Sequence, residues 1–101
     1  MIVRLTREAE LDLETIARRI ARDHPARALS FVREMREQCL GLAEFPGRFP
    51  LVPRYEQHGV RHRVHGNYLI FYRIEDDRVT VLHVLHGAMD YAPHLFPERS
   101  G

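Results

Sequence analysis

Three short segments with strand-forming composition, separated by tight-turn sequences, constrain the fold of this chain more than any other feature. Residues 60–64 alternate apolar and basic side chains, whereas residues 68–74 and 79–85 are rich in the aromatic and β-branched types that favour strands. The junctions are His-Gly-Asn at 65–67 and Glu-Asp-Asp at 75–77, and such residues accept the backbone conformations of tight hairpins. The sequence therefore predicts three consecutive strands, each antiparallel to the next.

The first half of the chain has the pattern of a short strand followed by two helices. Residues 2–5 are a strand candidate, and Thr6 can cap a helix whose apolar residues recur at 9, 13, 16 and 20. Pro25 ends this helix, because the residue before a proline is pushed out of the helical region, and it can begin the second helix. The second helix should stop before Pro46, and residues 45–58, with three prolines, are expected to form an irregular connection. The apolar stripe of the second helix consists of Ala28, Phe31, Met35, Cys39 and Leu42.

These elements predict an α+β fold in which a short N-terminal strand and a helical hairpin pack on a three-to-four-stranded antiparallel sheet. With 101 residues, of which 45% are hydrophobic, the chain has material for one core, and we expect a single domain over residues 1–101. Fifteen basic and fourteen acidic side chains give a net charge near +1, so any contact with nucleic acid would be local.

The cysteine content, the apolar runs and the type of basic residue indicate the cellular compartment and the chemistry that the chain can perform. Cys39 is the only cysteine, which excludes an internal disulfide and suits a reducing compartment. No apolar run approaches the roughly 20 residues that cross a bilayer, so we expect no membrane contact and a cytoplasmic location. All fifteen basic residues are arginines, and a guanidinium cannot serve as a general base because it essentially never loses its proton.

The predicted sheet has apolar residues on both faces. Strict alternation along the last strand puts Val79, Val81 and Leu85 on one face and Leu82 and Val84 on the other. The middle strand likewise offers residues 68, 70, 72 and 74 against Leu69 and Phe71. A lone antiparallel sheet usually has polar residues on its outer face, so we expect a partner, or a second copy of the chain, to cover the second face.

The same segments carry a family resemblance. Gly-Val-Arg at 59–61, His-Gly-Asn-Tyr-Leu-Ile-Phe-Tyr-Arg-Ile at 65–74 and Val-Leu-His-Val-Leu-His-Gly-Ala-Met-Asp at 81–90 together resemble the C-terminal signature of the RelE/ParE toxin superfamily, most closely its ParE branch. The order of the N-terminal elements is similar to that family as well.

The resemblance implies the toxin of a type II toxin-antitoxin pair that binds DNA gyrase and stabilises its cleaved-DNA state without cofactor or catalysis of its own. It implies a ParD-like antitoxin, one segment of which covers the second face of the sheet in a hetero-oligomer. Operator DNA would be reached only indirectly, through the ribbon-helix-helix of that antitoxin.

Arg61 and Arg63 are the best polar candidates in the chain. Residues two apart on a strand project from the same face, so the pair could hold a phosphate or a carboxylate in a forked geometry. The alternative is an edge strand protected by charge. In the RNA-cleaving RelE branch, basic residues at matching positions take part in catalysis, which the resemblance extends to this pair.

Other positions depart from the nuclease pattern. Leu69 stands where the resemblance places a catalytic arginine of RelE-like nucleases, and Met89 stands where many ParE-like chains carry arginine. An endoribonuclease would therefore have to use Arg61 and Arg63 with His86 as base and Tyr91 as acid. The alternative functions are thus a RelE-like ribosome-dependent mRNA endoribonuclease and a non-toxic partner-binding module.

The histidines are not arranged for a metal. Residues three apart on a strand point to opposite faces, so neither His62 with His65 nor His83 with His86 can chelate one ion, and only a cross-strand pair of His62 and His83 stays open. We expect no metal site.

The residues expected to contact the antitoxin or the target are Arg61, Arg63, Leu69, Phe71, Arg73, His83, Met89 and Asp90. Asp90 has the alternative role of capping a terminal helical segment at 91–96.

Overall fold

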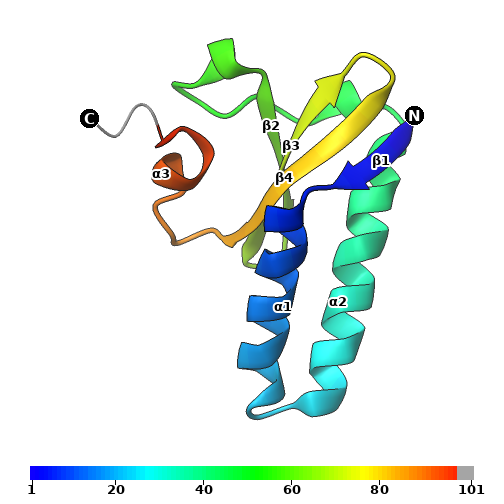
Figure 1. Ribbon diagram of the computed structural model, residues 1–101, viewed down its shortest axis with the longest axis vertical. Coiled ribbons are helices and arrows are strands. Elements are labelled where there is room, and N and C mark those ends of the chain that lie inside the picture. Colours follow the sequence, from blue (N-terminus) through cyan, green and yellow to red (C-terminus); the bar gives the residue numbers. More distant parts are fainter. Residues whose placement is uncertain (98–101) are drawn as a thin grey trace.

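The computed structural model describes residues 1–97, and in this part the predicted α+β fold is confirmed. The single domain expected over residues 1–101 stays a prediction, and its residues 98–101 lie outside the described part. The elements are β1 (Ile2–Leu5), α1 (Arg7–Ala21), α2 (Pro25–Leu40), β2 (Val60–His65), β3 (Tyr68–Glu75), β4 (Arg78–His86) and α3 (Ala92–Leu95), with 3-10 turns at Gly41–Ala43, Pro46–Arg48 and Glu56–His58 between α2 and β2 (Figure 1).

The four strands form one sheet in the order β1-β4-β3-β2. The predicted hairpins β2-β3 and β3-β4 are antiparallel, whereas β1 pairs with β4 in parallel. The sheet is therefore mostly antiparallel, with one parallel pair that the sequence did not predict. The helical hairpin and the two later strands separate β1 from β4 in the chain, which leaves β1 free to lie in either direction along the edge of β4.

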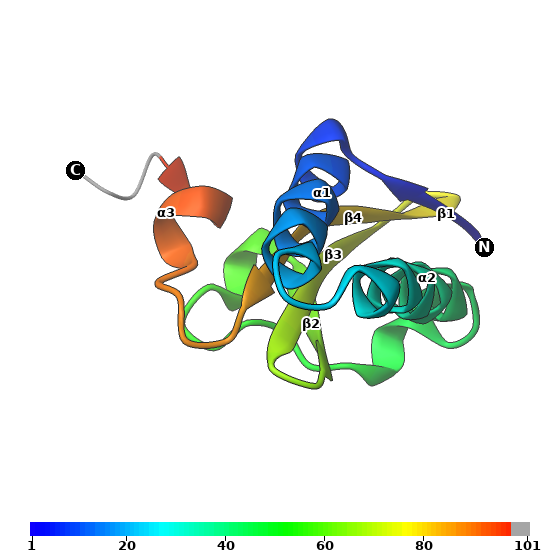
Figure 2. The ribbon, with the colours of Figure 1, turned by 90° about the horizontal axis from the view of Figure 1, so that it is seen from below.

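The helices begin where the sequence indicates, but α2 ends at Leu40, so Leu42 of its predicted apolar stripe lies in the 3-10 turn at Gly41–Ala43. The hydroxyl of Thr6 accepts a hydrogen bond from the backbone N–H of Ala9 at 3.1 Å, which caps α1. Pro25 occupies the first turn of α2. Figure 2 shows α1 and α2 side by side on one face of the sheet, where their apolar stripes form the main core with β3 and β4. No helix within residues 1–97 has the length and apolar composition of a membrane span.

A β-bulge at Leu82 corrects the predicted faces of β4. Phe71 pairs with His83 and Tyr72 pairs with Val81, so Leu82 is one extra residue opposite β3. The bulge shifts the alternation, and Val84 joins the main core while Leu85 faces the opposite side of the sheet. The assignment of Leu85 to the face of Val79 and Val81, and of Val84 to the opposite face, is therefore wrong.

The second face of the sheet has its own core. Phe71 and Leu85 are buried there with Val52 of the connection before β2, Val60 at the start of β2 and Phe96, which directly follows α3. Figure 2 shows α3 across the sheet from α2. The expectation that a partner must cover the second face is wrong for Phe71, because distant parts of the same chain cover it.

Candidate functional site

Arg61 and Arg63 lie on the helix-covered face of β2, opposite Tyr72 and Ile70 of β3, so the prediction that they share a face is confirmed. Their guanidinium groups bind the chain itself. One nitrogen, Nη1 of Arg61, donates to the carbonyl oxygens of Gly47 at 3.0 Å and Phe49 at 2.7 Å. Nη1 of Arg63 donates to the carbonyl oxygen of a residue near the end of α2, Gln38, at 3.0 Å.

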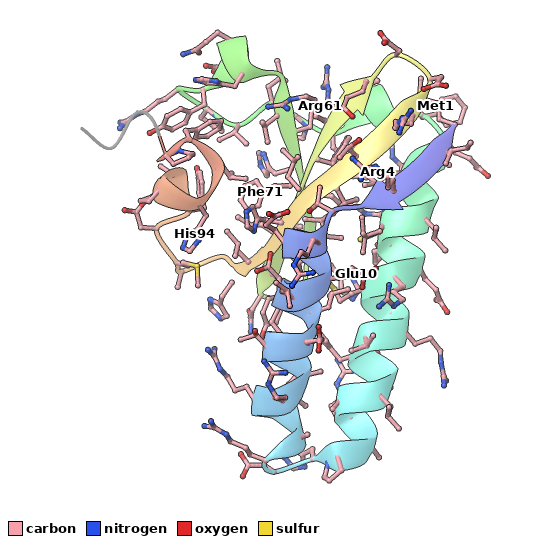
Figure 3. All side chains as sticks on the ribbon, viewed as in Figure 1. Met1, Arg4, Glu10, Arg61, Phe71 and His94 are labelled. Atoms are coloured by element: carbon pink, nitrogen blue, oxygen red, sulfur yellow. The ribbon has the colours of Figure 1, made fainter. Side chains whose placement is uncertain are left out.

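The arginine pair also packs against an aromatic ring of the same loop. The guanidinium of Arg63 lies 4.9 Å from the centre of the Phe49 ring, and that of Arg48 lies 4.8 Å from it. Cations over an aromatic face are attracted by the electrons of the ring. In this structure the pair therefore fastens the loop at 46–49 to the sheet, and Figure 3 shows Arg61 on β2 at the base of that loop.

His86 and Tyr91 lie on different sides of the sheet. Nδ1 of His86 accepts a hydrogen bond from the backbone N–H of Ala88 at 3.0 Å, and its ring meets the Tyr68 ring edge-on in the main core region. The Tyr91 ring packs 5.0 Å from the Phe71 ring in the second core. Of the four residues of the nuclease alternative, the structure brings together only Arg61 and Arg63.

On the second face, Arg73 and His83 line a polar cavity of about 290 Å³. Nε of Arg73 donates to the carbonyl oxygen of His58 at 3.3 Å. Nδ1 of His83 lies 2.8 Å from a carboxylate oxygen of Asp12, and its ring centre lies 6.0 Å from that of His94. The cavity is lined by Thr6, Glu8, Arg73, Leu82, His83, His94 and Leu95.

Asp12 is a residue that the sequence reasoning missed. Its oxygen Oδ2 also accepts a hydrogen bond from the backbone N–H of Val84 at 2.9 Å, beyond the point where β1 stops pairing with β4. The only sequence signal is position, since Asp12 lies three residues after Ala9 and four before Ile16, at the edge of the buried face of α1.

The remaining predicted contact residues differ in accessibility. Phe71 is 1% exposed and lies between the sheet and α3 (Figure 3), and Leu69 is partly buried in the same core. Met89 and Asp90 are exposed. The capping role of Asp90 is wrong, because α3 begins after Tyr91 and has no side-chain cap.

The cross-strand histidine pair does not form. His62 and His83 pair with Phe71 from opposite sides, so the whole of β3 separates them. Nδ1 of His62 is buried without a hydrogen-bond partner within residues 1–97, and this burial lowers the pKa of the imidazole. The same residues contain no group of three or more side chains arranged to hold a metal ion.

A second surface that the sequence reasoning missed is a groove on the outer side of the helical hairpin. It has a volume of about 710 Å³, and Leu29 within it is 73% exposed. The helix residues at the floor of the groove are small, so a hollow remains between the two helices, and arginines lie at its margin. The groove is lined by Ala17, Arg18, Ala21, Pro25, Ala28, Leu29, Val32, Arg33 and Arg36.

Comparison with known proteins places this sequence and fold in a family. Residues 3–91 match the model of the ParE toxin of the type II toxin-antitoxin system parDE. The structure is similar to a chain of the chromosomal ParDE system from P. aeruginosa, with a TM-score of 0.75, 22% identity, and coverage of 85% of this chain and 95% of that chain.

It is also similar to a chain of the toxin-antitoxin complex RelBE2 from Mycobacterium tuberculosis, with a TM-score of 0.63, 30% identity, and coverage of 87% of this chain and 92% of that chain. The curated proteins include no match to this chain. Since the family model spans most of the sequence, the chain belongs to the ParE toxin family of type II toxin-antitoxin systems.

Proposed function

We propose that this chain is a cytoplasmic toxin that inhibits growth by binding DNA gyrase and stabilising its cleaved-DNA state, and that a ParD-like antitoxin neutralises it in a hetero-oligomer. Operator DNA is reached only through the antitoxin. The family match over residues 3–91 supports a ParE-type toxin. The observation that carries the choice of binding over catalysis is that the guanidinium groups of Arg61 and Arg63 bind carbonyl oxygens of their own chain.

Chemical requirements support the same choice. Cleavage of RNA through its 2′-hydroxyl needs a base and an acid within hydrogen-bond reach of one phosphodiester, and a cation for the charge that develops on it. His86 and Tyr91 pack against rings on opposite sides of the sheet, an arrangement that does not favour their meeting at one phosphodiester. At the position where the resemblance places a catalytic arginine of RelE-like nucleases, this chain has the uncharged side chain of Leu69.

We propose the groove between α1 and α2 as the place where the antitoxin docks. Its apolar floor fits the apolar side of an amphipathic helix, a recurring way in which helices are recognised. Arg18 and Arg33 at its margin favour a helix with acidic residues beside its apolar face, whereas the third arginine there, Arg36, already pairs with Glu10. The exposed residues Met89 and Asp90, and Arg73 and His83 at the polar cavity, are the further contacts expected for the antitoxin or the target.

One observation favours the endoribonuclease as a second candidate. The RelBE2 chain is 30% identical to this one over most of its length. In that case a ribosome-bound substrate would have to free Arg61 from the loop carbonyls and Arg63 from the carbonyl of Gln38 in α2 before either could bind a phosphate.

The test is pulse labelling of DNA and protein synthesis in the first minutes after the chain is induced alone, followed by gyrase cleavage assays with the purified chain. An early fall in DNA synthesis, with cleaved DNA accumulating, is the expected result. An immediate fall in translation would instead identify the endoribonuclease. A folded chain that changes neither rate would identify a non-toxic binding module. The antitoxin groove is tested separately by Leu29→Glu, which should abolish antitoxin binding while Glu44→Gln, away from the groove, preserves it.

A further inference from the structure

Phe45 combines backbone strain with exposure. Its φ and ψ are 53° and 55°, the left-handed conformation, and its side chain is 76% exposed. For a bulky side chain this conformation is unfavourable, and glycine is the residue that normally occupies it. A buried ring would offset the strain by packing, but this ring remains mostly in water. Residues held in such conformations cluster at functional sites.

The loop behind Phe45 is held firmly. The hydroxyl of Tyr72 donates to the carbonyl oxygen of Pro46, and the backbone N–H of Arg48 donates to the carbonyl oxygen of Phe45 at 3.1 Å. Arg61 donates to two further carbonyl oxygens of the same loop. The loop therefore presents the Phe45 ring on a fixed backbone, and a fixed element loses little conformational freedom when it binds.

We propose that the Phe45 loop, residues 45–49, is the surface with which this toxin contacts its protein target. The partner it fits is a folded protein with an apolar pocket bordered by carboxylates. A single projecting aromatic ring is the kind of residue that fills such a pocket at the centre of an interface. Three guanidinium groups lie in the loop or on the strand that supports it, those of Arg48, Arg61 and Arg63. A pocket with an acidic border is complementary to this positive charge.

The position of the loop separates it from the antitoxin groove. The groove lies along the part of the helical hairpin near the α1-α2 connection, whereas the Phe45 loop follows the other end of α2 (Figure 1). The shapes differ as well. The groove is concave and suits a helix laid into it, while the Phe45 loop projects and suits a pocket that already exists in a folded partner.

This inference rests on the proposed function, since it assumes a toxin that acts by binding a protein. The test compares Phe45→Gly and Phe45→Ala with the unaltered chain in binding to purified gyrase, in gyrase-mediated DNA cleavage and in growth inhibition. Glycine accepts the left-handed backbone, so the Tm of Phe45→Gly should not fall. Val64→Ala is the matched control, because Val64 is 63% exposed and lies on β2, away from the loop.

We expect both Phe45 variants to bind gyrase at least 10-fold more weakly, with a similar loss of toxicity, while Val64→Ala binds normally. Unchanged binding in folded Phe45→Gly and Phe45→Ala would overturn the inference and leave gyrase as the target. If the unaltered chain does not bind gyrase but both variants lose growth inhibition, the loop assignment stands and the gyrase proposal fails. An unaltered chain that neither binds gyrase nor slows growth would overturn both.

Discussion

Removing the carboxylate of Asp12 should destabilise the fold more than any other change of a single polar side chain on α1. One oxygen of Asp12 accepts hydrogen bonds from the backbone N–H of Val84 at 2.9 Å and from Nδ1 of His83 at 2.8 Å. Val84 is 0% exposed. Beyond Leu5, β1 no longer pairs with β4, so the Asp12 carboxylate takes the place of a strand partner at this edge.

Asp12→Ala should therefore leave the N–H of Val84 buried and unpaired. Such a group costs about 1–3 kcal/mol, and loss of the hydrogen bond with His83 adds about 1 kcal/mol. Since the Asp12 side chain is 20% exposed, water can compensate in part, and we expect a total loss of about 2–3 kcal/mol. For a domain of this size that lowers Tm by roughly 10–20 °C, measurable by circular dichroism or calorimetry.

Two further variants separate the contributions. Asp12→Asn keeps one acceptor oxygen and should lose about half as much stability as Asp12→Ala. In a His83→Gln background, Asp12→Ala should still cost at least about 1 kcal/mol, because the N–H of Val84 remains unpaired. A fall in Tm of less than roughly 4 °C for Asp12→Ala, about 1 kcal/mol, would refute the reasoning and mean that water replaces the carboxylate at this edge.

Three other predictions follow from the ionisable groups. Arg36 holds the pKa of Glu10 below its usual 4.5 by a two-pronged hydrogen bond, so Glu10→Gln should cost at most about 1 kcal/mol at neutral pH. That difference should vanish as the pH falls below 4.5 and through the folded pKa, which urea titrations at several pH values can measure. Burial raises the pKa of the Cys39 thiol to about 11, so a disulfide reagent should label it only at the rate of unfolding. Burial lowers the pKa of His62, so the free energy of unfolding should decrease as the pH falls below 6.5, the unfolded pKa of the imidazole. His62→Gln should flatten the dependence of this free energy on pH between pH 7 and 5.5. An unchanged dependence would mean that the imidazole is already solvated in the folded chain.

Local signals in the sequence were enough to predict where the two long helices begin and where the strands of the hairpins turn. Thr6 caps α1, Pro25 starts α2, and the turn residues join β2 to β3 and β3 to β4 as predicted. Each of these signals acts through contacts with residues a few positions away, so the sequence states it directly. The three predicted strand segments needed only short extensions at their ends.

The features that could not be predicted from the sequence depend on contacts between residues that lie far apart in the chain. The bulge at Leu82 follows from the register of β4 against β3, and no composition signal marks it. The core that buries Phe71 includes Val52 and Phe96, which lie 19 and 25 residues away in the chain, and the ring of Tyr91 packs on it. The role of Asp12 requires knowing that β1 ends at Leu5. Periodicity identified which side chains are apolar, but it does not identify which part of the chain will cover them.

The same limit applies to Arg61 and Arg63, and it bears on the choice between inhibitor and nuclease. Two arginines on one strand face look alike from the sequence whether they bind a phosphate or a backbone carbonyl, since a guanidinium donates to either. Here their acceptors are main-chain oxygens in and before the Phe45 loop, which no side-chain pattern encodes. The pair is thus accounted for by the need to hold that loop in place. Its presence on β2 is therefore no evidence for RNA cleavage by this chain, and the loop that it holds becomes the part of the toxin to test first.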